Sequence, residues 1–125
     1  MPPRGIRILV VDDLKDQRES LQRLLELEGY EVATAADGSQ AVHAMRARPA
    51  QVLLTDIFMP GQEGIETIAY FRREWPHVRI IAMSGGGEVS RGAYLGVAES
   101  IGADATLKKP FSFAVLLATL ASLDV

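Results

Sequence analysis

The sequence predicts a single α/β domain in which a parallel sheet is covered by helices on both faces. Short β-branched runs alternate with longer segments whose apolar residues recur every three to four positions, and this alternation continues through the whole chain. Parallel strands need crossover connections, and helices commonly provide them, so this alternation favours a doubly wound parallel sheet. Because 125 residues are enough for one hydrophobic core, we expect residues 1–125 to form one domain.

The first part of the chain predicts two strands and a helix between them. A run of apolar residues at 6–11 predicts the first strand, and residues 31–35 predict a weaker second strand. Leucines at helical spacing predict the intervening helix, which Gly29 terminates. The leucines at this spacing, with charged residues between them, are Leu21, Leu24 and Leu25.

The second helix is expected to begin after Asp37, whose carboxylate can cap the helix, and to end before Pro49. Its inner face is expected to carry Ala41, Val42 and Met45. Residues 52–55 predict the third strand, and their nearly continuous apolar character is typical of a parallel strand buried on both faces.

The second half of the chain predicts two further strands, at 78–83 and 106–108, and three further helices. The third helix is expected to carry Ile65, Ile68 and Phe71 and to stop at Trp75-Pro76. The fourth is expected at about 94–101 and the last at 112–123. The core residues expected in the last helix are Leu116, Leu117, Leu120 and Leu123.

The composition excludes several classes of protein. With 48% hydrophobic and 23% charged residues and a net charge of −3, the chain fits neither a disordered segment nor a basic nucleic-acid-binding arm. The absence of cysteine excludes disulfide scaffolds, cysteine-ligated zinc and thiol catalysis. No signal peptide or membrane span is evident. We therefore expect a cytoplasmic protein that binds neither a membrane nor nucleic acid directly.

Polar side chains stand at the carboxyl ends of the expected strands, which is where ligands bind in sheets of this type. These residues are Asp12, Asp13, Asp56, Ser84 and Lys109. Three carboxylates this close would repel one another unless a cation were present. Oxygen ligands without histidine or cysteine favour Mg²⁺, with Mn²⁺ as the alternative.

Each of these residues also has a simpler interpretation when it is taken alone. Asp13 or Asp16 could cap the first helix, with Glu19 completing a capping box from Asp16. Ser84 could be an ordinary loop residue, and Lys109 could pair with a surface acid.

Taken together, the residues indicate phosphoryl chemistry, because Mg²⁺ prefers sites that phosphate oxygens complete. Asp56 could be the nucleophile that accepts a phosphoryl group. Lys109 and the Ser84 hydroxyl would then hold two of its oxygens.

This set of motifs resembles the receiver domain of two-component response regulators, in particular the single-domain, chemotaxis-type architecture. The matching motifs are Asp12-Asp13, Asp56 within LLTDIFMPG, Ser84 after IIAM, and Lys109-Pro110-Phe111. The resemblance implies a flavodoxin-like fold with strand order 2-1-3-4-5 and phosphotransfer from a sensor histidine kinase to Asp56.

The resemblance also implies roles for individual residues. Asp13, Asp56 and the backbone carbonyl of Phe58 would ligate Mg²⁺, while Asp12 would act mainly through water. Lys109 would pair with the phosphoryl group, Ser84 would move to hydrogen-bond it, and the peptide bond before Pro110 would be cis.

The expected switch departs from the family pattern at one position. Thr106 stands where receivers with an aromatic switch carry Tyr or Phe, so Ser84 cannot be coupled to a rotating ring in the usual way. Tyr94, on the expected fourth helix, is a candidate substitute. For both Thr106 and Tyr94 a purely structural role is the simpler alternative.

The last helix lacks a charged face, which a solvent-exposed helix normally has. We expect a protein to cover it, as in a homodimer through the face formed by the fourth helix, fifth strand and fifth helix. Plain exposure of small residues is the alternative.

The expected function is that of a stand-alone receiver, because the chain stops where its last helix ends. It would catalyse only its own phosphorylation and dephosphorylation and would signal to a downstream protein by changing a binding surface. A phosphorelay intermediate and a receiver fragment of a longer regulator are alternatives. A Mg²⁺-dependent aspartyl-phosphate phosphatase is disfavoured because Phe58 stands where such enzymes need a second aspartate.

Overall fold

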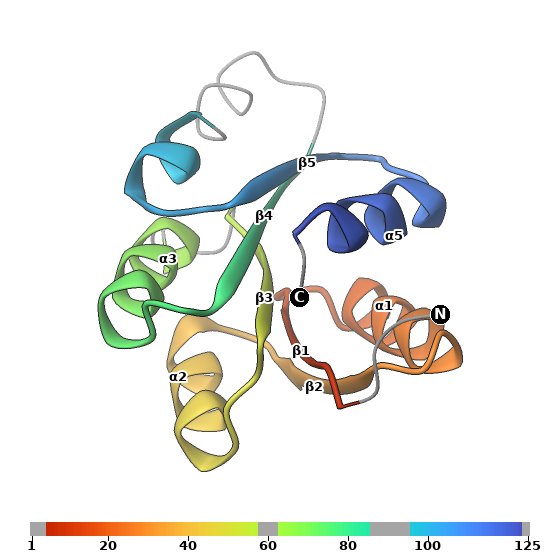
Figure 1. The fold of residues 1–125 in the computed structure, drawn as a ribbon, viewed down its shortest axis with the longest axis horizontal. Helices are drawn as coiled ribbons and strands as arrows, with labels where there is room; N and C mark the ends of the chain where they lie inside the picture. The colour runs from red at the N-terminus through yellow and green to blue at the C-terminus, as the bar shows by residue number, and fades with distance from the viewer. Residues whose placement is uncertain (1–4, 58–62, 86–95, 124–125) are drawn as a thin grey trace.

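A computed structural model describes residues 5–57, 63–85 and 96–123. These residues form a five-stranded parallel sheet between two layers of helices (Figure 1). In sheet order the strands are β2 (Glu31–Ala35), β1 (Arg7–Val11), β3 (Val52–Asp56), β4 (Arg79–Gly85) and β5 (Ala105–Lys109). The predicted fold class and the strand order 2-1-3-4-5 are therefore confirmed.

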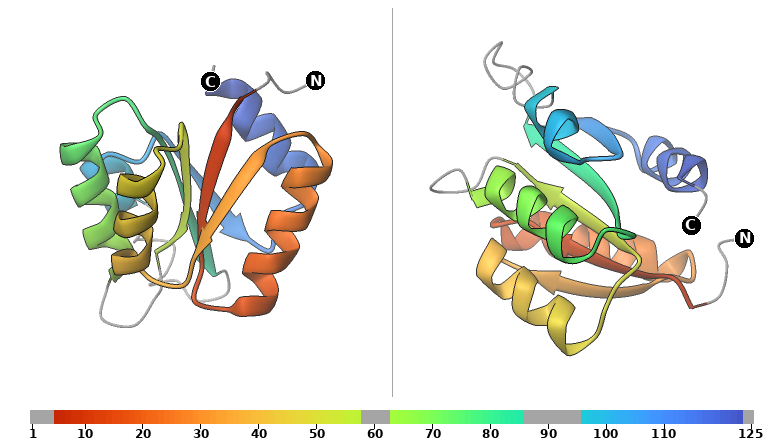
Figure 2. Two further views of the ribbon diagram at one scale, coloured as in Figure 1. Left: turned by 90° about the horizontal axis from the view of Figure 1, so that it is seen from below. Right: turned by 60° about the vertical axis from the view of Figure 1, so that its left-hand side comes forward.

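The two faces of the sheet are covered by different helices (Figure 2). α1 (Lys15–Leu27) and α5 (Phe113–Ser122) pack on one face. α2 (Gly38–Ala47), α3 (Glu63–Glu74) and the helical residues 96–101 pack on the other. Side chains alternate between the faces along each strand. In β1, Ile8 and Val10 belong to the core beneath α1 and α5, whereas Leu9 and Val11 belong to the core beneath α2 and α3.

The buried residues of β3 confirm that this strand is covered on both faces. All five of its residues are buried, and it pairs with β1 on one side and β4 on the other. Leu53 packs in the core beneath α2 and α3, and Leu54 packs in the core beneath α1 and α5. Asp56 is therefore the last residue of a strand that is buried along its whole length.

The ends of several helices agree with the sequence pattern. The Asp37 carboxylate accepts a hydrogen bond from the Gln40 backbone N–H at 2.7 Å, and the Gln40 side chain accepts one from Ala36 at 3.0 Å. The Ser112 hydroxyl caps α5 by accepting a hydrogen bond from Val115 at 3.2 Å. These caps satisfy backbone donors that a helix start otherwise leaves without partners.

Of the three leucines at helical spacing in α1, only two contribute to the core. Leu25 is fully buried and Leu21 packs at the edge of the same core, but Leu24 is 40% exposed. A helix on the sheet buries a narrow stripe, and Leu24 lies at the margin of that stripe.

An arginine network, not apparent from the sequence, joins α3 to the amino ends of β4 and β5. The Arg72 guanidinium donates hydrogen bonds to the carbonyls of Gly102, Pro76 and Val78 and forms an ion pair with Asp104 at 2.7 Å. The same Asp104 oxygen accepts a hydrogen bond from the Ile80 backbone N–H at 2.8 Å. This network holds Gly102 and Asp104, which directly precede β5, against α3 at the end of the sheet opposite the aspartates.

None of the helices in the described ranges is both long enough and apolar enough to cross a membrane.

Candidate functional site

Three aspartates meet at the carboxyl edge of the sheet. Asp12 and Asp13 follow β1 directly, and Asp56 is the last residue of the neighbouring β3. A carboxylate oxygen from each of the three lies within 4.8 Å of the others. Asp12 is fully buried and Asp56 is 5% exposed, whereas Asp13 is exposed. The sheet therefore concentrates negative charge at one point, partly away from solvent.

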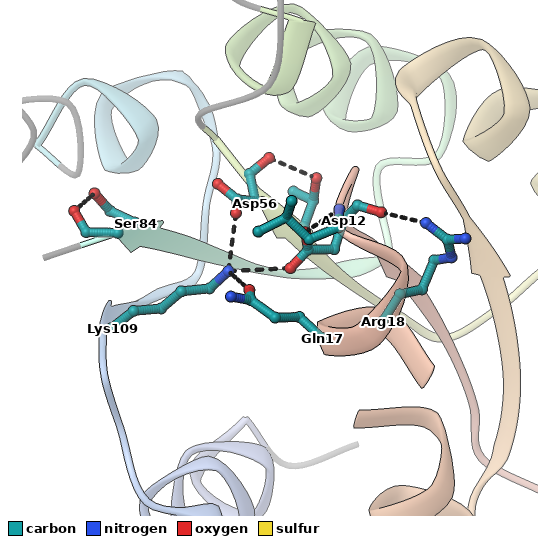
Figure 3. Close-up of polar contacts among 9 residues, drawn as sticks. Asp12, Gln17, Arg18, Asp56, Ser84 and Lys109 are labelled. Atoms are coloured by element: carbon teal, nitrogen blue, oxygen red, sulfur yellow. Dashed lines mark hydrogen bonds and ion pairs between the residues drawn. The ribbon is translucent and has the colours of Figure 1, made fainter. Parts of the chain in front are cut away.

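Lys109 places an ammonium group against this acidic cluster (Figure 3). Its Nζ lies 2.9 Å from Asp56 Oδ2, 3.0 Å from Asp12 Oδ2 and 2.7 Å from Gln17 Oε1. Lys109 is the last residue of β5, which β4 separates from β3, so its long side chain crosses the end of an intervening strand. The interpretation of Lys109 as an ordinary surface ion pair is wrong, because its side chain is only 18% exposed and bridges two aspartates.

Two opposing effects act on the pKa of Lys109. Burial of the ammonium lowers the pKa, whereas the hydrogen bond and charge of Asp56, followed by those of Asp12, raise it. The carboxylates prevail, and the pKa lies above the ordinary value for lysine. Lys109 therefore stays charged at neutral pH.

The donor chemistry of the cluster fits a hard divalent cation. Its three carboxylates provide oxygen ligands of the kind that Mg²⁺ and Mn²⁺ prefer. One ammonium compensates only one of three carboxylate charges, so a divalent cation would neutralise the cluster. The predicted fourth ligand, the carbonyl of Phe58, lies outside the described residues.

Ser84 lies within β4 and not after it, because this strand continues to Gly85. It is buried, and its hydroxyl donates a long hydrogen bond of 3.4 Å to the Gly85 carbonyl. β4 lies between the strands that carry Asp56 and Lys109, so Ser84 belongs to the same edge of the sheet (Figure 3). The interpretation of Ser84 as a loop residue is therefore wrong.

The two predicted switch residues are only partly described by the structure. Thr106 lies in β5 opposite Ala82 of β4 and is half-buried. Tyr94 lies outside the described residues, so its role as a substitute for the missing aromatic residue stays a prediction.

The turn between β1 and α1 is built differently from the capping predicted for it. Leu14 occupies the N-cap position of α1 without a side-chain cap, so neither Asp13 nor Asp16 caps this helix. Asp12 Oδ1 accepts a hydrogen bond from the Leu14 backbone N–H at 2.9 Å. Arg18 Nη1 donates to the Asp12 carbonyl oxygen at 2.8 Å (Figure 3). These bonds fix Asp12 from both its side chain and its backbone.

Gly64 allows α3 to approach the backbone that carries Asp56. A Cβ atom at this position would lie 2.5 Å from the Asp56 carbonyl oxygen and 2.4 Å from Ile57 Cα, both closer than real Cβ contacts allow. The sequence shows a glycine near the start of a helix, but only the structure shows that it contacts the backbone of Asp56 and Ile57.

A cavity of about 590 Å³ adjoins the acidic cluster between α1 and the segment after β5. Gln17 and Leu21 line it on the α1 side, and Lys109, Pro110 and Phe111 line it on the other. The peptide bond between Lys109 and Pro110 is cis. The Lys109 ammonium thus lies where the acidic cluster opens into this cavity.

Comparisons with known proteins agree with this geometry. A family model described as the response regulator receiver domain matches residues 8–121. The response regulator MprA of Mycobacterium tuberculosis is 37% identical over 120 residues, covering 95% of this chain and 50% of the relative. MprA of Mycobacterium avium gives the same identity over 119 residues. The chain thus spans about half the length of these curated relatives.

Solved structures show the same fold. The chemotaxis protein CheY4 of Vibrio cholerae superposes with a TM-score of 0.84 at 28% identity, covering 94% of this chain and 97% of that one. A CheY-like receiver domain protein of Methanospirillum hungatei gives a TM-score of 0.83 at 29% identity, covering 94% and 91%.

Proposed function

The chain belongs to the response regulator receiver domain family of two-component systems, and on that basis we propose that it accepts a phosphoryl group from a sensor histidine kinase onto Asp56. The observation that carries this proposal is the position of the Lys109 ammonium, 2.9 Å from Asp56 Oδ2 and 3.0 Å from Asp12 Oδ2. A nucleophilic carboxylate, a fixed cation and two further acidic groups lie together at one edge of the sheet.

The proposed step is a displacement at phosphorus. A carboxylate oxygen of Asp56 forms the new O–P bond, the N–P bond of the phosphohistidine breaks, and its electron pair stays on the imidazole nitrogen. The imidazole then takes a proton from solvent if it leaves as the anion. Lys109 would stabilise the charge on the phosphoryl oxygens through a charge-assisted hydrogen bond, and Ser84 would donate its hydroxyl proton to another of them.

Asp12, Asp13 and Asp56, with the carbonyl of Phe58, are the residues that would hold Mg²⁺ or, alternatively, Mn²⁺. Such an ion, when bound, neutralises charge on the phosphoryl oxygens and so lets two anionic groups approach. Two hydrogen bonds hold Asp12 in place for this role. The Leu14 N–H donates to the Asp12 carboxylate, and the Arg18 guanidinium donates to the Asp12 carbonyl.

Signalling would follow from the charge that phosphorylation adds, about −1.5 to −2 at pH 7. Ser84 would reorient toward that charge and so change the surface near β4 and β5 that a downstream protein recognises. Thr106 lies on β5 opposite Ala82 of β4.

The face around α5 is a proposed site of protein contact, including a homodimer. α5 has no charged residue between Phe113 and Ser122, and Val115 is 48% exposed. Val97, in the helical segment 96–101, is 45% exposed. A cytoplasmic location, where a histidine kinase presents its phosphohistidine, belongs to the same proposal. Action as a single domain, in a relay or within a longer regulator is compatible with this phosphotransfer step.

The test is phosphorylation by a small donor. The intact protein is incubated with Mg²⁺ and acetyl phosphate, and its mass is measured beside that of Asp56→Asn and Asp37→Asn. Asp37→Asn is a matched control because asparagine caps a helix about as well as aspartate, and Asp37 is not one of the three clustered carboxylates. We expect one phosphoryl group on the wild type and on the control, and none on Asp56→Asn. Equal incorporation in all three proteins would contradict the proposal.

A further inference from the structure

Gln17 contacts the functional ammonium from outside the carboxylate cluster. Its Oε1 accepts a hydrogen bond from Lys109 Nζ at 2.7 Å, which is shorter than the contacts of the same ammonium with Asp12 and Asp56 (Figure 3). Gln17 lies in the first turn of α1 and is exposed. This contact therefore links α1 to the end of β5 across the mouth of the site.

The acceptors around Lys109 differ in kind. An ammonium has three N–H donors, and Asp12, Asp56 and Gln17 can accept all of them. The two carboxylates also belong to the cluster that would hold a cation, and one oxygen of Asp56 would become esterified during phosphotransfer. The amide of Gln17 is neutral and takes no part in that bond change. Its contact with Lys109 can therefore persist while the others are exchanged.

The cavity beside the site leaves room in which the Lys109 side chain could move, and the contact with Gln17 limits that movement. Lys109 and Gln17 both line the cavity of about 590 Å³, so the lysine side chain has free space on that side. A lysine side chain is long and flexible, and its ammonium has many accessible positions when nothing fixes it. A hydrogen bond from the α1 side restrains the ammonium from turning into the cavity.

We propose that Gln17 is a positioning residue for phosphotransfer, which holds the Lys109 ammonium beside the acceptor oxygen of Asp56 through a neutral hydrogen bond. The inference rests on the proposed function, because it assigns Gln17 a part in that same reaction. A neutral acceptor fixes the ammonium without compensating the positive charge that the phosphoryl oxygens need. A carboxylate at this position would weaken that charge and repel the incoming phosphoryl group.

The test uses Gln17→Met, which keeps the length of the side chain and its helix propensity but removes the acceptor. Gln22→Met is the matched control, since Gln22 lies on the same helix and lines a different cavity, with Glu19, Arg23 and Glu26. The rate of phosphorylation by acetyl phosphate in Mg²⁺ is followed by intact mass. We expect Gln17→Met to be about three- to tenfold slower than wild type, the range that the loss of one hydrogen bond gives. We expect Gln22→Met to match the wild type.

A second measurement reports on Lys109 without any reaction. The two protons on Cε of Lys109 are diastereotopic, so their NMR shifts differ clearly when the side chain is held in one conformation and converge when it samples many. We expect well-separated shifts in the wild type and in Gln22→Met, and a smaller separation in Gln17→Met.

The inference requires both effects in Gln17→Met and neither in Gln22→Met, and any other pattern overturns it. A wild-type protein that takes up no phosphoryl group on Asp56 would instead overturn the proposed function, and this inference with it. Normal uptake by the wild type with an unchanged rate in Gln17→Met would remove only the role of Gln17.

Discussion

Lys109 Nζ lies 2.9 Å from Asp56 Oδ2, although β4 separates the strands that carry these two residues. The lysine can reach Asp56 because β3, β4 and β5 are in register and end at the same edge of the sheet. The site therefore depends on the parallel register as well as on the identity of its residues.

Removal of the exposed carboxylate from the acidic cluster should weaken metal binding but stabilise the metal-free fold. Asp13→Asn takes away one of three mutually repelling carboxylates. We expect the midpoint of urea unfolding in EDTA to rise, because the repulsion decreases. We expect the affinity for Mg²⁺ to fall at least about tenfold. Calorimetric titration with Mg²⁺ and urea unfolding of the same samples measure both, and an unchanged Mg²⁺ affinity would exclude Asp13 as a ligand.

A methyl group at Gly64 should disturb the end of β3, which carries Asp56. Gly64→Ala would place a Cβ 2.5 Å from the Asp56 carbonyl oxygen, so the backbone must shift. We expect a loss of about 1–3 kcal/mol in the free energy of unfolding, together with slower phosphorylation. Gly96→Ala is the control, since no atom lies within 4 Å of its added Cβ and alanine favours a helix. Equal stability of the two variants, measured by urea unfolding, would contradict the close approach.

The stability of the metal-free protein should decrease at alkaline pH because of Lys109. Its folded-state pKa is raised, so its contribution is fully present below the unfolded pKa of about 10.4 and is lost as pH rises through the folded pKa. Tyr30, whose pKa is raised by burial and then by Glu28, acts in the same direction. Tyr30→Phe removes that second contribution.

Urea unfolding in EDTA from about pH 8 to pH 11 checks this expectation in the Tyr30→Phe background. We expect the free energy of unfolding to decline toward the alkaline end, and the decline to be weaker once Lys109→Met is added. Parallel curves for the two proteins would show that Lys109 is not stabilised by the aspartates.

The Arg72 network should contribute to stability without taking part in phosphotransfer. Arg72→Gln leaves the carbonyls of Gly102 and Val78 without the guanidinium donor and removes the ion pair with Asp104. We expect a loss of about 1–3 kcal/mol in the free energy of unfolding. The neighbouring Arg73→Gln removes a side chain that is 68% exposed and should change stability by less than about 0.5 kcal/mol. Similar losses in both variants would contradict a specific role for the network.

Local sequence signals predicted the elements of the fold well. Asp37 and Pro49 delimit α2 through backbone hydrogen bonding and steric exclusion, which act within a few residues. The apolar run of β3 predicts a strand that is buried on both faces, because such runs are typical of parallel strands between two helix layers. The exposure of Leu24 was not predictable in this way, because it depends on how α1 is rotated against the sheet.

In the candidate site, the residues at the strand ends could be predicted from the sequence, whereas the contacts made by the helices could not. Asp12, Asp13, Asp56 and Lys109 could be placed together from the sequence, because the ends of parallel strands share an edge. The contacts of Gln17 and Gly64 could not, since each joins a helix to a distant strand through a geometry that only the packed structure defines.

The location of the phosphoryl group tests the central claim most directly. Borohydride reduces an aspartyl phosphate to homoserine, and peptide mapping by mass spectrometry then identifies the modified position. After incubation with Mg²⁺ and acetyl phosphate, we expect homoserine at position 56 and at no other aspartate. Homoserine at position 12 or 13, or a stable phosphate on Ser84, would contradict the account.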